Sequence, residues 1–326
     1  SYSLWWIIAH AYWYRFHGDF AYLKQQGKYL KGLLKLLLSK IDKNGAEKLD
    51  GVRFLDWPTG KDDAAIHGGL QALLIIALGE GAWLCNALGE SSSAKACEKG
   101  IKLLRSHQPE PTINKSSSAL QVLAGILDAG KTNRKVFAAE PFNGLSTFYG
   151  YYVLQARAKA GDFNGCFELL RKYWGGMLDL GATTFWEHFE LDWLEKAGRI
   201  DEVPKKGKRD VHRDCGSYCF VGLRHSFCHG WASGPTPWLS EHVLGVKVLR
   251  PGAKEVMLEP HLGSLKWARG SFPTPQGDIA IELSSKGKAA KPSLKIKAPK
   301  GVKIIEKQKS WISIASFKFG AKRLAK

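Results

Sequence analysis

The segment TTFWEHF, residues 183–189, places a carboxylate, Glu187, directly after two aromatic residues, Phe185 and Trp186. An aromatic ring stacks on the apolar face of a sugar, and a nearby carboxylate can activate the water that cleaves a glycosidic bond. The same residues can also begin a helix, because a threonine N-cap followed by a glutamate makes a capping box. A cap does not need the adjacent Trp186, which favours the sugar-cleaving interpretation, but the residues alone leave both open.

A second carboxylate stands beside an indole in FLDWPTG, residues 54–60. Pro58 disfavours a helical conformation for Trp57, so we expect Asp56 and Trp57 to lie in a loop between helices. There Asp56 could bind sugar hydroxyls while Trp57 stacks on the ring, or it could cap the next helix. The sequence supports these two roles about equally.

A third cluster, RHSFCHGWASGPTPW, residues 224–238, gathers histidine, tryptophan and proline around two glycines. Its histidines could donate hydrogen bonds to a substrate or be buried imidazoles whose hydrogen bonds are satisfied. Composition alone favours the buried role.

These clusters must be positioned by a fold that is helical over most of its length. In residues 20–41 the large aliphatic residues recur at spacings of three, four and seven, which is one stripe of an α-helix. Residues 70–90 and 118–130 repeat the pattern, with glycine or aspartate in the breaks. We therefore predict helices from residue 1 to about residue 245.

A weak internal repeat supports stacked helix pairs. HGDFAYLKQQGKYLKGLL, residues 17–34, aligns with AGDFNGCFELLRKYWGGML, residues 160–178. In both, a helix is expected to end at glycine, and the following aspartate is expected to cap the next helix. Repeated helix hairpins in one large domain predict an α/α toroid whose loops frame a pocket.

The apolar period changes after GVKVLRPGAKEVMLEP, residues 245–260. Ile279, Ile281 and Leu283 alternate with polar residues, as do Leu294 and Ile296, and KSWISIASFKF, residues 309–319, alternates similarly. Period-2 alternation with turn residues between the runs predicts strands. We expect two domains, a helical one over 1–245 and a small antiparallel β-sandwich over 246–326.

The net charge of +18 does not indicate a nucleic-acid partner. Residues 286–326 hold thirteen Lys or Arg against one acid, Glu306, without a nucleic-acid-binding motif. The lysines alternate with apolar residues, which is typical of a solvated sheet face. A surface that attracts an acidic polysaccharide is the alternative.

The composition indicates neither a cofactor nor a membrane span. Six cysteines lack zinc-type pairing, since Cys215 and Cys219 have no second pair with ligand spacing, and we expect no metal. No run reaches the ~18 apolar residues of a membrane-spanning helix. The chain opens inside a helix-like segment without an initiating Met, so we expect a piece of a longer protein in which a signal sequence would not be visible.

The order of these motifs resembles one known family. TTFWEHF followed by HSFCHGWASGPTPWLSEHVLGVKVLRPGAKEVMLEPHLGSLKWARGSFPTPQGDI resembles the C-terminal half of the bacterial α-L-rhamnosidases of glycoside hydrolase family 78. SYSLWWIIAH, FLDWPT and the terminal strands extend the resemblance over essentially the whole chain.

The resemblance implies an (α/α)6 barrel, here without its early hairpins, followed by a β-sandwich. It also implies an inverting hydrolase of terminal α-L-rhamnosides from a plant or algal polysaccharide or glycoside, in a periplasmic or secreted location. The glutamate of the TT-WE motif, Glu187, would be the general base. The residues implied to line the rhamnose pocket are Asp56, Trp57, Trp186, His229 and Trp231.

Two departures from the family pattern bear on activity. The acidic, Arg-containing motif that carries the general acid has no equivalent here, so we expect that acid upstream of Ser1. Family members commonly follow TT-WE with Arg-Trp-Asp, where this chain has His188, Phe189 and Glu190. A different toroid glycosidase, a polysaccharide lyase and a non-catalytic carbohydrate-binding fragment are the alternative functions. In each case the expected partner is a carbohydrate.

Overall fold

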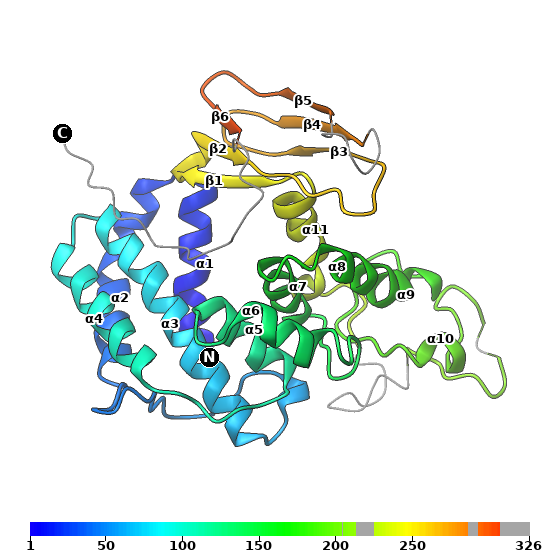
Figure 1. The fold of residues 1–326 in the computed structure, drawn as a ribbon, viewed down its shortest axis with the longest axis horizontal. Coiled ribbons are helices and arrows are strands. Elements are labelled where there is room, and N and C mark those ends of the chain that lie inside the picture. Colours follow the sequence, from blue (N-terminus) through cyan, green and yellow to red (C-terminus); the bar gives the residue numbers. More distant parts are fainter. Residues whose placement is uncertain (204, 213–224, 286–292, 307–326) are drawn as a thin grey trace.

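The computed structural model describes residues 1–203, 205–212, 225–285 and 293–306. In the described residues the regular elements up to Val243 are helices, and two small sheets follow, which lie together at one end of the helices (Figure 1). The predicted strand in residues 309–319, Cys215, Cys219 and much of the lysine-rich C-terminal segment lie outside the described residues.

The α-helices are α1 (Tyr2–His17), α2 (Phe20–Leu38), α3 (Asp63–Ala87), α4 (Ser91–Ser106), α5 (Lys115–Ala124), α6 (Ala129–Thr132), α7 (Tyr149–Lys159), α8 (Phe163–Leu169), α9 (Gly175–Asp179), α10 (Trp193–Lys196) and α11 (Pro235–Trp238). Shorter helical turns are η1 (Trp57–Thr59), η2 (Asn133–Phe137), η3 (Leu170–Trp174), η4 (Gly230–Ala232), η5 (Leu239–Val243) and η6 (Pro251–Ala253).

The predicted helical stripes are the buried faces of α2, α3 and α5. In α2 the buried side chains include Leu23, Leu30, Leu34 and Leu37, which follow the spacing of one helix face. Helix α3 is buried on most sides because α1, α2, α4 and α5 all pack against it. A helix that is apolar all round is stable only when neighbours cover it, so α3 forms the centre of this part of the core.

Helix α3 is long and apolar enough to cross a membrane by length and composition, and it is the single such helix in the described parts of the chain. Its most apolar stretch is 78% buried inside the protein. This burial is typical of a core helix.

The weak internal repeat corresponds to two equivalent helix junctions. Helix α1 ends at Gly18, whose φ of 67° lies in the left-handed region that favours glycine, and the Asp19 carboxylate accepts a hydrogen bond from Tyr22 N–H at the start of α2. Gly161, with φ of 80°, and Asp162 occupy the same positions between α7 and α8. The predicted glycine stop and aspartate cap are both confirmed.

The strands of the described residues form two three-stranded sheets. One contains β1 (Val246–Arg250), β2 (Glu255–Leu258) and β6 (Lys303–Glu306), and the other contains β3 (Trp267–Phe272), β4 (Ile279–Ser284) and β5 (Ser293–Lys297). The expectation of purely antiparallel sheets is wrong, because β6 pairs parallel to β2. After β5 the chain crosses to the other sheet, where β6 pairs with β2. The connection between these two parallel strands is long, because it includes β3, β4 and β5, and is not a hairpin.

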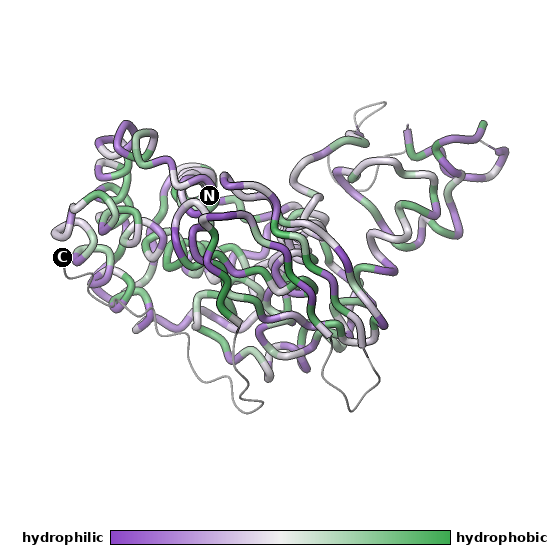
Figure 2. The backbone as a smooth tube through the Cα atoms, turned by 90° about the horizontal axis from the view of Figure 1, so that it is seen from above, coloured by the Kyte–Doolittle hydropathy of each residue, from purple (hydrophilic) through white to green (hydrophobic). Residues whose placement is uncertain are grey.

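The core is continuous between the helices and the strands. One buried cluster joins α7–α9 side chains to those of β1, β2 and β4, while a second cluster lies among α1–α5. Hydrophobic and hydrophilic residues are interleaved along the backbone of both parts (Figure 2). The strands therefore pack directly on the second half of the helical region.

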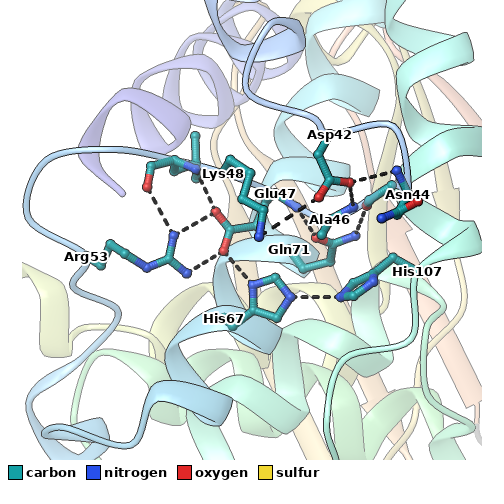
Figure 3. A network of polar contacts seen from close by, with 11 residues as sticks. Asp42, Asn44, Ala46, Glu47, Lys48, Arg53, His67, Gln71 and His107 are labelled. Atoms are coloured by element: carbon teal, nitrogen blue, oxygen red, sulfur yellow. Dashed lines mark hydrogen bonds and ion pairs between the residues drawn. The ribbon is translucent and has the colours of Figure 1, made fainter.

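A buried polar network fixes the loop that leads from α2 to Asp56. The fully buried Glu47 carboxylate accepts hydrogen bonds from Arg53 Nη2 at 2.6 Å and from Leu49 N–H at 2.9 Å, and lies 2.7 Å from His67 Nδ1 (Figure 3). Burial raises the pKa of Glu47, but its hydrogen bonds with His67 and Arg53 outweigh burial, and the net result is a lowered pKa. The loop is thereby tied to α3, which carries His67.

Candidate active site

The two motif segments around Glu187 and His229 lie side by side. Glu187 N–H donates to the Ser226 carbonyl at 2.9 Å, and His229 N–H donates to the Phe185 carbonyl at 2.8 Å. The Thr184 hydroxyl adds a hydrogen bond to the Phe227 carbonyl. Residues some forty positions apart therefore form one structural unit, as expected if they share a site.

Glu187 lies in an irregular segment between α9 and α10 and not at a helix start. Its Oε2 accepts a hydrogen bond from Ser226 N–H at 3.2 Å and lies 3.8 Å from His229 Nδ1. In the described residues, Oε1 accepts no hydrogen bond. The side chain is 14% exposed, so the carboxylate is held at Oε2 without being fully shielded from solvent. The helix-capping alternative is therefore not the one that the structure adopts.

The backbone of Glu187 is held from two sides. The Trp231 indole N–H donates to the Glu187 carbonyl at 3.1 Å, and the buried Thr147 hydroxyl donates to the same oxygen. Both lone pairs of this carbonyl are thus used, which limits rotation of the segment. Such support is what a catalytic carboxylate needs to keep its position.

Trp186 does not line a pocket, contrary to the prediction. It is fully buried and packs edge-on against Phe189, Phe227 and His225. Adjacent residues in an extended segment point to opposite sides, so a Glu187 side chain near the surface places Trp186 in the core. Trp186 therefore anchors the segment and cannot stack on a ligand in this conformation.

His225 supports the same segment from behind. Its Nε2 accepts a hydrogen bond from His188 N–H at 3.2 Å, and its ring packs against Trp193 and Phe227. Burial lowers the pKa of His225 to about 4, assisted by the nearby charges of His188 and His212. It is a neutral acceptor near neutral pH. Composition favoured buried histidines in this cluster, and His225 is one, whereas His229 is only partly buried.

Asp56 is buried and hydrogen-bonded on both oxygens. Oδ1 accepts from Trp57 N–H at 2.9 Å, which caps η1, and Oδ2 accepts from the hydroxyls of Ser116 at 2.8 Å and Ser146 at 2.7 Å. Burial raises the pKa of Asp56 in spite of these hydrogen bonds. The capping role is therefore present, and a sugar hydroxyl would have to share this carboxylate with two serines.

Asp56, Trp57 and Trp231 meet at one cavity of about 330 Å³. Helix α1 supplies one wall, and Phe148, which stacks on Trp231 at 5.8 Å between ring centroids, supplies another. Trp57 is 43% exposed, so a ring face is available to a ligand. The lining residues are Ser1, Tyr2, Trp5, Ile8, Ala9, Tyr12, Phe54, Leu55, Asp56, Trp57, Phe148, Tyr152 and Trp231.

Glu187 is not itself among the lining residues, but two neighbours connect it to this cavity. Trp231 lines the cavity and binds the Glu187 carbonyl, and His229 contacts both the Trp231 ring, at 4.4 Å, and the Glu187 carboxylate. The consecutive residues Ser146 and Thr147 bind Asp56 and Glu187, respectively. The structure thus brings together all predicted site residues except Trp186, which lies behind them.

Several residues of the site were not predicted. Tyr2, Trp5, Ala9 and Tyr12 recur at helix spacing and give α1 an aromatic face toward the cavity, a pattern that was visible in SYSLWWIIAHAY. The serine and threonine contacts carry no such signal, because these residues occur throughout the chain and their roles depend on tertiary packing.

Comparisons with known proteins find similar sequences and folds among rhamnosidases. Residues 245–305 match the family described as bacterial alpha-L-rhamnosidase C-terminal domain. An alpha-L-rhamnosidase of Alteromonas sp. (strain LOR) is 32% identical over 128 residues, which is 38% of this chain and 12% of that protein.

Solved structures share the fold. The GH78 family rhamnosidase of Bacillus sp. GL1 is 22% identical, with a TM-score of 0.72 over 93% of this chain and 32% of that one. The Streptomyces avermitilis alpha-L-rhamnosidase complexed with L-rhamnose is 16% identical, with a TM-score of 0.67 over 89% of this chain and 28% of that one. The α-L-rhamnosidase from Aspergillus terreus is 18% identical, with a TM-score of 0.69 over 90% of this chain and 35% of that one. The chain thus spans about a third or less of the length of these relatives. The predicted resemblance is confirmed: residues 245–305 match the rhamnosidase C-terminal domain, a stretch of 128 residues is similar to a known α-L-rhamnosidase, and the chain is similar in fold to a GH78 rhamnosidase.

Proposed function

We propose that the protein containing this chain is an α-L-rhamnosidase, a glycoside hydrolase that releases terminal rhamnose with inversion and uses Glu187 as the general base. The single observation that supports this most is the placement of Glu187. Its carboxylate is held at Oε2 by Ser226 N–H, lies beside His229, and is joined through Trp231 to an aromatic cavity of about 330 Å³.

In the proposed reaction, Glu187 takes a proton from a water as that water attacks the anomeric carbon. The bond to the leaving oxygen breaks, and a general acid gives that oxygen a proton. Inversion requires the two carboxyl groups to be roughly 6.5–9.5 Å apart, so that the water fits between them. Glu187 is the one member of this pair that we assign.

The aromatic residues of the cavity are proposed to hold the sugar. Trp57 and Trp231 offer ring faces to its apolar side, and His229 is close enough to Glu187 to bind the same hydroxyl or water. Asp56 would bind a hydroxyl that points toward Ser116 and Ser146. Trp186 is proposed only as a support for the segment.

The larger architecture is part of the proposal. We propose that the helices of residues 1–245 belong to an (α/α)6 toroid and that residues 246–326 form a β-sandwich domain. The equivalent helix junctions at Gly18 and Gly161 and the two small sheets support this assignment.

A direct test follows the sugar product by NMR during hydrolysis of an aryl α-L-rhamnoside in the full-length protein. We expect β-L-rhamnose to appear first and to equilibrate later with the α anomer. Initial release of the α anomer would refute the inverting mechanism, and release of an unsaturated uronate from a polysaccharide would indicate a lyase.

A non-catalytic sugar-binding protein is a second candidate, favoured by one observation. Among the described residues that line the cavity, Asp56 is the one carboxylate, and it already accepts three hydrogen bonds. Binding of rhamnose with no hydrolysis by the full-length protein would support this candidate over the enzyme.

A further inference from the structure

The outer face of the sheet β3-β4-β5 carries an exposed aromatic platform away from the cavity described above. Trp267 is 68% exposed at the start of β3. The inward residues of β4, Ile279, Ile281 and Leu283, are buried, so the alternate residues face outward. An indole left this exposed on an ordered strand has no role in packing the core.

Strand pairing places polar residues beside Trp267 in regular rows. Trp267 lies opposite Ser284, which lies opposite Ser293, and the two serine Oγ atoms are 2.6 Å apart. The next row contains Arg269, Glu282 and Lys295. Residues directly opposite in antiparallel strands point to the same face, so both rows surround the same area.

These two rows border a shallow hollow of about 380 Å³. Its side chains combine one flat aromatic ring with hydroxyl, guanidinium, ammonium and carboxylate groups. These groups belong to Trp267, Arg269, Glu282, Ser284, Ser293 and Lys295, and Ala268 and Leu283 complete the lining. Stacking on an indole combined with hydrogen bonds from charged and hydroxyl groups is how proteins bind saccharides.

The charge of the face indicates an acidic ligand. The next row adds Lys297 opposite the small Ala280, so the three rows carry three cations against the single carboxylate of Glu282. In the described residues, no ion pair within 4 Å joins Glu282 to Arg269 or Lys295, so both cations can contact a ligand. An arginine binds a carboxylate in bidentate geometry.

We propose that this face is a second saccharide site, distinct from the candidate active site, which binds the uronate residues of an acidic oligosaccharide. Trp267 stacks on the sugar ring, Arg269 and Lys295 bind its carboxylate, and Ser284 and Ser293 bind hydroxyls. The site would hold an acidic polymer near the protein. It does not rest on the hydrolase proposal, because binding here requires no bond cleavage.

The experiment measures binding of an oligogalacturonate by calorimetry in the parent and in a Trp267→Ala variant. We expect the association constant to fall about tenfold, as the stacking contact is lost. Trp13→Ala is the matched control, because Trp13 is also exposed, at 46%, but lies on α1. It should bind as the parent does. Thermal unfolding and turnover of a small aryl rhamnoside should be unchanged in Trp267→Ala.

Charge is tested separately with an Arg269→Gln, Lys295→Gln double variant. It should lose affinity for the oligogalacturonate, and the parent should bind a neutral oligosaccharide of equal length more weakly, with less dependence on salt. Equal affinity of parent and Trp267→Ala would overturn the proposal. So would tighter binding to DNA than to the uronate, or a Trp267-dependent dimer in sedimentation, since these would assign the face to a nucleic acid or to a second copy.

Discussion

Acid should weaken the fold through His225, and the effect should reach the segment that holds Glu187. His225 is 7% exposed, and its Nε2 accepts the hydrogen bond from His188 N–H, which requires a neutral nitrogen. Burial lowers its pKa from 6.5 to about 4. The unfolded chain therefore takes up a proton at this residue as pH falls below 6.5, whereas the folded chain does so only near pH 4.

The sign and size of the effect follow from this difference. The folded-state pKa is below the unfolded one, so the contribution of His225 to stability is complete above pH 6.5 and decreases as pH falls toward 4. The difference between a pKa of 6.5 in the unfolded chain and about 4 in the folded one corresponds to about 3 kcal/mol of the free energy of unfolding. About 2 kcal/mol of this should be lost by about pH 5.

The perturbation is His225→Gln, because the amide oxygen can replace Nε2 as acceptor but does not bind a proton. Free energies of unfolding are measured by urea denaturation with tryptophan fluorescence, at about pH 7 and about pH 5. The variant should lose about 2 kcal/mol less than the parent between these conditions.

His242→Gln is the matched comparison. Burial lowers the pKa of His242 to about 4 as well, but this residue lies on η5, where it contacts Gln155 and Trp238. The His242→Gln variant should also lose about 2 kcal/mol less stability than the parent between about pH 7 and about pH 5, without altering the Glu187 segment. If His225→Gln keeps the full acid sensitivity of the parent, His225 is not the buried neutral acceptor described above.

Three further substitutions test the supports of the site. Trp231→Phe keeps a ring on Phe148 but removes the indole N–H that binds the Glu187 carbonyl. We expect turnover to fall about tenfold, because the lost hydrogen bond contributes about 1–2 kcal/mol. Unchanged turnover would show that this hydrogen bond does not position Glu187. Glu47→Gln keeps the shape of a fully buried side chain but removes its charge beside Arg53. Urea denaturation should show that the free energy of unfolding falls by about 2 kcal/mol. No change would mean that the network does not stabilise the loop. Asp162→Ala removes the cap of α8 and the ion pair with Arg157. We expect the free energy of unfolding, measured in urea, to fall by about 1–2 kcal/mol. A change within error would contradict the capping role.

Local features of the fold could be predicted because they depend on short spacings. The glycine stop and aspartate cap at Gly18 and Asp19, and again at Gly161 and Asp162, depend only on left-handed backbone and on a nearby acceptor. The strands Ile279–Ser284 and Ser293–Lys297 could be predicted from a change of apolar period. The parallel pairing of β2 with β6 could not be predicted, because it depends on how a distant segment crosses between sheets.

The site was only partly predictable for the same reason. The motif around Glu187 identified the carboxylate, but whether Trp186 or Glu187 faces outward depends on which side the core covers. The hydrogen bonds from Ser146 to Asp56 and from Thr147 to Glu187 join residues separated by 90 and 40 positions. No local pattern reports such contacts.

Glu187 is proposed to activate the attacking water, and the most direct test is rhamnose release by a Glu187→Gln variant of the full-length protein. Its kcat on an aryl α-L-rhamnoside should fall about 10²- to 10⁴-fold, while rhamnose binding measured by calorimetry stays near that of the parent. Glu190→Gln, which alters a neighbouring carboxylate that contacts His188, should keep most of the activity. A Glu187→Gln variant that hydrolyses the substrate at the parent rate would contradict the account.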